Sequence, residues 1–90
     1  MSLGRKTGKS EKTVSISTVS TITEIEVYTL RYWEREFSEF LNPPRSDGGQ
    51  RRYRPEDIQM VFTLKRLLRD EMFSIAGARR YLKNQFKNAA

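Results

Sequence analysis

The architecture of this chain follows from TLRYWEREF at residues 29–37, NPPR at residues 42–45 and GGQRRY at residues 48–53. The first segment predicts a helix that carries arginine and tyrosine side chains on its surface. The paired prolines prevent that helix from continuing, and the paired glycines supply the positive φ angles of a tight hairpin turn. A helix of this kind, followed by an arginine-tipped hairpin, is suited to gripping a polyanion.

The composition also indicates an anionic partner. The chain has 90 residues, a formal net charge of +6 and a pI near 10.0, and a basic balance of this size favours nucleic acid. Arginine's planar fork binds phosphate or guanine edges through paired hydrogen bonds, which lysine cannot do. Between residues 31 and 54 every basic residue is an arginine: Arg31, Arg35, Arg45, Arg51, Arg52 and Arg54.

The residues that most enzymes and metal sites use are missing. The chain contains neither cysteine nor histidine, so thiol chemistry, disulfides and the usual zinc ligands are absent from it. The acid pairs Glu34 with Glu36 and Glu56 with Asp57 do not converge on one substrate when they lie on a helix. We therefore expect no enzymatic activity, no metal and no cofactor. No apolar run is long enough to cross a bilayer, so we expect a soluble, cytoplasmic protein without a membrane partner.

Ninety residues suffice for one small domain, which we place at residues 14–90. Residues 1–13 are polar and basic, and we expect a disordered arm whose leading MSL resembles a cloning scar. GRKTGKS at residues 4–10 resembles a phosphate-binding loop. However, three residues rather than four separate its glycines, and no apolar strand precedes it. We therefore expect the arm to add only nonspecific attraction to phosphate.

TLRYWE and GGQRRY, at this separation, resemble the N-terminal DNA-binding domain of the MerR family of transcription regulators. The resemblance covers roughly residues 14–82. It implies a mostly α fold, a winged helix-turn-helix with about four helices and a small two-stranded β wing.

Residues 14–25, VSISTVSTITEI, allow two interpretations. Their β-branched residues and period-two alternation favour a strand, whereas the resemblance implies the first helix. As a helix, the segment places Ile16, Val19 and Ile22 on one face, with Ser15 or Ser17 as the N-cap. We predict the helix, because the next helix must pack against nearby apolar side chains.

The turn that follows departs from the family pattern. Glu24 stands where the family has a glycine, and Glu26-Val27 replaces the usual Ser-Pro start of the second helix. Glu24 must therefore occupy or avoid a left-handed backbone conformation. Thr23 and Glu26 offer a capping box, which would give the second helix a different start.

We predict the second helix at residues 26–37. Val27, Leu30 and Phe37 form its buried stripe, and Trp33 lies at the margin of that stripe. An alternative interpretation makes its aromatic residues part of the core and its arginines a solvated face. Pairing with the nearby acids Glu34, Glu36 and Glu39 would explain Arg35 better than Arg31, so Arg31 is the stronger candidate for contact with DNA. The resemblance implies that Tyr28 and Thr29 contact base edges in the major groove. It implies that Arg31 and Tyr32 contact phosphate or base. Arg35 is the remaining candidate on this helix.

We predict a hairpin wing after the prolines. Arg45 and residues 52–53 form its two short strands, and residues 46–50 form the turn. Tyr53 packs inward, while Arg51 and Arg52 point to opposite faces. The resemblance places the wing against the minor groove or the flanking backbone, through Arg45, Arg51 and Arg52.

Two further helices complete the predicted fold. Pro55 begins the third, although Arg54 stands where the family has a capping Ser or Thr, a loss of about 1 kcal/mol. The fourth, at residues 74–86, is capped by Ser74, and its Arg79 and Arg80 are expected to be solvated. The apolar residues of the third helix cover a wide arc and predict the centre of the core: Ile58, Val61, Phe62, Leu64, Leu67 and Leu68. One face of the fourth carries Ile75, Ala78, Leu82 and Phe86.

The function expected from this resemblance is sequence-specific binding to promoter duplex DNA. In the family, two copies distort the DNA between the promoter elements, so RNA polymerase is an indirect partner. Dimerisation uses a coiled coil beyond this domain, which implies a homodimer for the full-length protein and a monomer or weak dimer for this chain. The alternatives are a protein-interaction adaptor and an excisionase-like architectural DNA binder. An adaptor has no reason to keep the arginines of the second helix and the wing, so we favour DNA.

Overall fold

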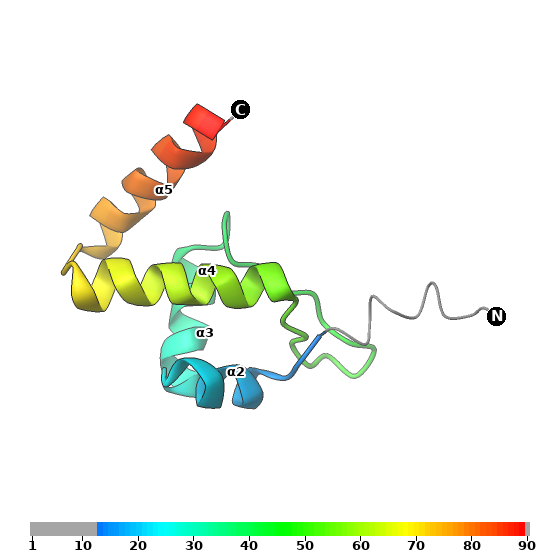
Figure 1. Cartoon of the computed structure of the whole chain (residues 1–90). Helices are drawn as coiled ribbons and strands as arrows, with labels where there is room; N and C mark the ends of the chain where they lie inside the picture. The colour runs from blue at the N-terminus through cyan, green and yellow to red at the C-terminus, as the bar shows by residue number, and fades with distance from the viewer. Residues whose placement is uncertain (1–12, 90) are drawn as a thin grey trace.

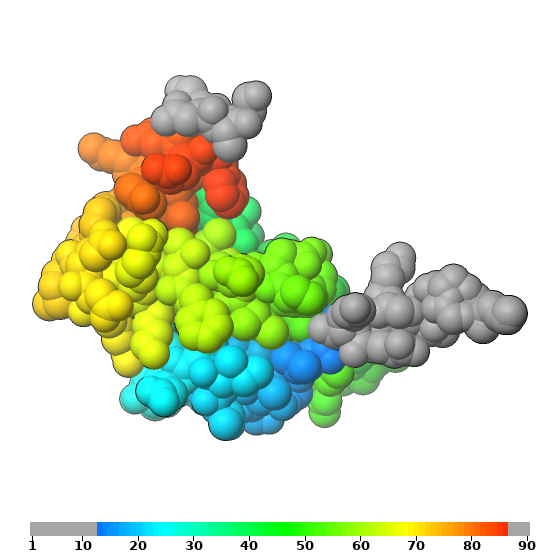
Figure 2. Space-filling view, in the orientation of Figure 1, coloured from blue at the N-terminus to red at the C-terminus, as the bar shows by residue number. Residues whose placement is uncertain are grey.

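The computed structural model describes residues 13–89, with side chains to residue 86, and α4 lies at the centre of the described fold (Figure 1). The other helices pack around it, and a π-helical turn, η1, extends its C-terminal end. The elements are α2 (Ile16–Thr23), α3 (Val27–Glu36), α4 (Pro55–Lys65), η1 (Arg66–Asp70) and α5 (Ile75–Ala89). Figure 2 shows α4 across the near face, with α2 on one side of it and α5 on the other. The predicted arm and its loop-like motif lie outside the described residues, apart from Thr13.

Helix α2 confirms the helical interpretation of residues 14–25. Ser15 is its N-cap and accepts a hydrogen bond from the Thr18 backbone N–H at 3.3 Å, which satisfies an otherwise unpaired donor. The predicted face is wrong in one position, because Ile22 is 49% exposed while Thr23 is buried. An α-helix has 3.6 residues per turn, so side chains at a constant spacing of three move progressively around it. Val19 and Thr23 are four residues apart and lie on the same face, which the rest of the fold covers. The Thr23 hydroxyl is satisfied there by donating to the Val19 carbonyl at 2.8 Å.

The turn after α2 places Glu24 in the left-handed region, at φ 62° and ψ 33°. Its backbone N–H donates to the Ser20 carbonyl at 2.8 Å and closes the helix. The next residue, Ile25, is thereby turned into the core, where it is fully buried. The predicted capping box is wrong, since Glu26 is the N-cap of α3 without a side-chain cap and the Thr23 hydroxyl bonds back into α2.

Replacing Glu24 with glycine is expected to raise the free energy of unfolding by about 0.5–1 kcal/mol. A left-handed conformation is costly for a residue with a Cβ atom and accessible to glycine. Urea denaturation measures the change. Glu24→Ala is the matched control, because it removes the same charge but keeps the Cβ, and we expect it to change stability by less than about 0.5 kcal/mol. A glycine variant no more stable than the alanine variant contradicts the prediction.

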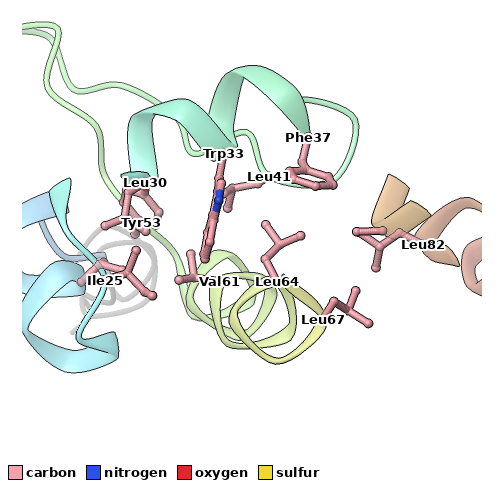
Figure 3. Packing of buried hydrophobic residues seen from close by; sticks show 12 residues of the cluster. Ile25, Leu30, Trp33, Phe37, Leu41, Tyr53, Val61, Leu64, Leu67 and Leu82 are labelled. Carbon is pink, nitrogen blue, oxygen red and sulfur yellow. The ribbon is translucent and has the colours of Figure 1, made fainter. Parts of the chain in front are cut away.

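The core joins all the helices to the segment that follows α3 (Figure 3). The centre of the core is on α4, as predicted. Phe62 is nevertheless 42% exposed, because the apolar residues of α4 spread around more of the helix than the rest of the fold covers. Trp33 is 3% exposed and belongs to the core rather than to its margin, whereas Val27 is only half-buried. The buried apolar side chains are Val19, Ile25, Leu30, Trp33, Phe37, Leu41, Tyr53, Val61, Leu64, Leu67, Ala78 and Leu82.

Arg54, the N-cap of α4, makes no side-chain capping hydrogen bond, as predicted, but an acid in the first turn binds it. Asp57 accepts the Arg54 backbone N–H at 2.9 Å, and its two oxygens also accept the Arg54 guanidinium at 2.7 and 2.9 Å. The carboxylate is 2% exposed, so its charge is compensated by this forked contact and by the helix N-terminus. The acid in the first turn therefore supplies the half of a capping box that accepts the N-cap N–H, without the half that accepts a first-turn N–H.

Helix α5 begins as predicted, with Ser74 accepting the Gly77 backbone N–H at 2.9 Å. Arg80 is exposed, but the prediction of a solvated Arg79 is wrong. Arg79 donates to the Glu36 carbonyl at 2.8 Å and to its carboxylate at 3.2 Å, and its guanidinium lies 5.9 Å from the centre of the Phe37 ring. Arg79 therefore fixes α5 to the C-terminal end of α3.

Candidate nucleic-acid interface

Helix α3 presents one exposed stripe opposite its buried one. The stripe consists of Tyr28, Arg31, Tyr32 and Arg35, all exposed and spaced i, i+3, i+4 and i+7, which brings them onto a single helix face. Tyr28 is 73% exposed. The Arg35 guanidinium lies 5.5 Å from the centre of the Tyr32 ring, a cation–π contact. The structure thus brings four of the predicted site residues together.

Thr29 is placed differently from the other candidates on α3. It is half-buried and lies beside the stripe rather than on it. Its hydroxyl donates to the Glu26 carboxylate at 3.3 Å. Arg69 of η1 donates to the same carboxylate, also at 3.3 Å. Hydrogen bonds from the backbone and from Arg69 hold the pKa of Glu26 below its ordinary value. An ionised acid therefore stands at the start of α3, engaged with η1 rather than with the stripe.

The predicted pairing of Arg35 with acids of its own helix is wrong. Glu36 is bound by Arg79, and Glu34 is bound from the wing. Within residues 13–86, neither Arg31 nor Arg35 forms an ion pair. The reason for preferring Arg31 over Arg35 as a contact is therefore lost, and both guanidinium groups are available to an external anion.

The wing is a short hairpin whose pairing differs from the prediction. Arg45 pairs with Arg51 in an antiparallel bridge, whereas Tyr53 pairs with Val14, just before α2. The turn closes with Ser46 N–H donating to the Gln50 carbonyl at 2.7 Å, and Gly49 has a φ of 85°. The prediction paired Arg45 with residues 52–53, because a partner from the start of the domain cannot be read from the local pattern.

Glu34 connects the wing to α3. Its carboxylate accepts hydrogen bonds from the Arg51 guanidinium and from the Tyr53 hydroxyl. Tyr53 is fully buried, as predicted, and the side chains of Arg51 and Glu34 are 20% and 12% exposed. Arg52 points the other way and donates to the Thr13 carbonyl at 3.1 Å, which confirms that the two arginines face opposite sides. No local signal in the sequence marks Glu34 as the partner of the wing, so its role was not predicted.

The buried Tyr53 predicts loss of stability in alkali. Burial and the Glu34 carboxylate raise the pKa of the Tyr53 hydroxyl above its ordinary value of 10. The folded state therefore holds a proton that the unfolded state releases. The contribution to stability is complete below about pH 10 and falls as the pH rises further, by up to about 1.4 kcal/mol per pH unit. Urea denaturation between about pH 9 and pH 12 measures this slope, and Tyr53→Phe is expected to flatten it. Equal slopes for the two proteins would refute the assignment.

A cleft separates α3 from the wing and collects candidates from both elements. It is lined by Arg31, Glu34, Arg35, Asn42, Arg45 and Arg51. A second cleft, towards the start of α2, is lined by Ser15, Ile16, Ser17, Arg31, Gly49, Gln50 and Arg51. Arg31 and Arg51 line both. The predicted contacts on helix and wing therefore surround a shared hollow rather than two separate surfaces.

Within the described residues, no group of three or more Asp or Glu side chains could hold a metal ion. The helices of the described part are all too short or too polar to span a membrane.

Comparison with known proteins is consistent with this geometry. The family model for MerR HTH family regulatory proteins matches residues 14–85. The HTH-type transcriptional repressor CarA of Myxococcus xanthus is 37% identical over 67 residues, which are 73% of this chain and 23% of CarA. The HTH-type transcriptional regulator MlrA of Escherichia coli (strain K12) is 31% identical over 71 residues, 79% of this chain and 28% of MlrA. The chain thus spans about a quarter of the length of these relatives.

A solved structure has the same fold. It is a crystal structure of HiNmlR, described as a MerR family regulator lacking the sensor domain, bound to promoter DNA. The two chains superpose with a TM-score of 0.66 at 24% identity, over 82% of this chain and 57% of that one. The likeness confirms the predicted fold class, a helix-turn-helix domain with few strands.

Proposed function

This chain belongs to the MerR family of helix-turn-helix regulatory proteins, and from that premise we propose that it binds double-stranded promoter DNA in a sequence-specific manner. Helix α3 enters the major groove, and the wing lies against the backbone or the minor groove. Tyr28 and Thr29 approach base edges, while Arg31, Tyr32 and Arg35 contact phosphate or base. The wing contributes Arg45, Arg51 and Arg52.

The exposed stripe on α3 is the observation that carries this proposal. Its aromatic and arginine side chains have no packing role in the described fold, since the opposite face of the helix fills the core. Arg45 adds an exposed guanidinium from the wing, beside the same hollow. Arg51 and Arg52 are already bound by Glu34 and Thr13, so they contact DNA through guanidinium N–H groups that these bonds leave over.

We infer that the full-length protein is a cytoplasmic homodimer that distorts promoter DNA, so that RNA polymerase is affected indirectly. The chain described here is expected to be a monomer or weak dimer, because α5 offers too few heptads for a stable coiled coil. Light scattering at micromolar concentration tests this, and the mass of a stable dimer would contradict it.

The experiment that tests DNA binding is enrichment of a random duplex library by the purified chain, with affinity followed against salt. We expect recovery of a compact half-site and affinity that falls steeply as salt rises, because each neutralised phosphate releases condensed counterions. Salt-sensitive binding without enrichment would contradict sequence-specific recognition and favour an architectural role. Failure to bind at low salt would refute the proposal and favour a protein-interaction adaptor.

A further inference from the structure

The arginines around the cleft between α3 and the wing differ in whether they have a carboxylate partner. Arg31, Arg35 and Arg45 all line this cleft, and none of them forms an ion pair within residues 13–86. The ion pairs of the described residues join Arg51 to Glu34, Arg54 to Glu56 and Asp57, Arg66 to Glu71, Arg69 to Glu26, and Arg79 to Glu36. Arg52 and Arg80 also have no carboxylate partner within residues 13–86, but neither lines this cleft, so three of the five arginines without one meet here.

The one acid that lines this cleft is already occupied. Glu34 accepts from Arg51 through one carboxylate oxygen and from Tyr53 through the other. Its charge therefore compensates Arg51 and leaves the other three arginines uncompensated. Like charges held close together repel one another, and an anion between them removes that repulsion.

The donors approach the cleft from two elements. Arg31 and Arg35 lie one helical turn apart on α3, while Arg45 comes from the wing and Asn42 from the segment between them. The Arg45 guanidinium donates through one nitrogen to the Gly49 carbonyl at 3.0 Å, which fixes its position and leaves its other N–H groups to bond outward. Guanidinium forks bind phosphate oxygens in pairs, so this lining is suited to a phosphodiester.

We propose that this cleft is a subsite for a single backbone phosphate of the bound duplex, held between Arg31 of α3 and Arg45 of the wing. The inference rests on the proposed function, because the phosphate belongs to the DNA. Arg35 and Asn42 flank the subsite. Arg51 is a positioning residue, since its bond to Glu34 keeps the wing beside α3. The recognition helix and the wing therefore grip the same point on one strand.

The probe is the enriched half-site duplex with one phosphate at a time replaced by a neutral methylphosphonate. Fluorescence anisotropy gives the dissociation constant for the parent chain, Arg31→Ala and Arg45→Ala. Arg80→Ala is the control, because it removes an exposed arginine on α5 that does not line the cleft. Circular dichroism verifies that each variant is folded.

We expect one position per half-site at which the methylphosphonate weakens binding of the parent chain about tenfold. Arg31→Ala and Arg45→Ala each bind the unmodified duplex more weakly, and each loses less further affinity at that position than the parent chain does, because only one arginine still contacts the phosphate. Arg80→Ala retains the full loss. The shared subsite would be overturned if the two variants lost their sensitivity to the methylphosphonate at different positions. It would also be overturned if each variant remained as sensitive as the parent chain at every position. In either case the proposal of DNA binding would still stand. Failure of the parent chain to bind the unmodified duplex would overturn both proposals.

Discussion

Replacing both Arg31 and Arg35 with alanine is expected to weaken binding to the enriched half-site by about 100-fold, because each change removes a charge-assisted contact from the exposed stripe of α3. If both residues contact phosphate, the loss is uniform across sequences, and the slope of log affinity against log salt falls by about two units. If either reads a guanine, specificity relaxes at one base pair instead. Anisotropy titrations over a range of salt concentrations measure both effects.

The matched control for this pair is Arg80→Ala combined with Lys83→Ala. Both residues are exposed on α5, and the double change lowers the net charge by the same amount. General electrostatic attraction to DNA falls equally in the two double variants. The difference in their affinities therefore measures what the stripe contributes beyond its charge. Equal losses of affinity would show that the stripe contributes only its charge, and would remove α3 from the proposed interface.

Replacing Glu34 with alanine is expected to lower the free energy of unfolding by about 2–4 kcal/mol. The change leaves the fully buried Tyr53 hydroxyl without its acceptor and the half-buried Arg51 without its partner, and unpaired buried polar groups are costly. Urea denaturation at neutral pH measures the loss. The wing is also expected to lose its fixed position beside α3, because the bonds that hold it there are gone.

Two further variants isolate the cause of this loss. Glu39→Ala removes an exposed acid from the segment just after α3, and we expect a change below about 0.5 kcal/mol. Glu34→Ala in a Tyr53→Phe background should cost less than in the parent chain, since the hydroxyl that needs an acceptor is already absent. A Glu34 variant as stable as the Glu39 variant would show that Glu34 does not hold the wing.

The helices and their ends could be predicted from the sequence. Ser15, Pro55 and Ser74 begin their helices where their chemistry indicates, because capping hydroxyls and the fixed φ of proline act within a few residues. The resemblance resolved the one segment in which local propensity favoured a strand, residues 14–25. Its β-branched side chains form α2 because Val19 and Thr23 are buried against the rest of the fold, and such packing outweighs propensity.

The candidate site could be predicted in part. Helical periodicity leaves the arginines and tyrosines of α3 off its buried stripe, and the resemblance directs them to DNA. Thr29 was placed with them by resemblance, yet its hydroxyl bonds to Glu26, which the local pattern could not show. The two clefts beside the wing were not foreseen, because each is built from elements that only folding brings together.

Local chemistry thus fixed the helices other than α2, the wing turn and the arginine-rich face, because caps, prolines, glycines and helical periodicity act over short stretches of chain. Folding alone decided which charges far apart in the sequence form ion pairs. Glu34 lies 17 residues from Arg51 and 19 from Tyr53, and Glu36 lies 43 residues from Arg79. An ion pair depends on the distance between two charges in space. The sequence does not show which arginine will lie close to which acid once the chain has folded. Folding left Arg31, Arg35 and Arg45 at the cleft without an acid partner, and these are the arginines that we place around the bound phosphate.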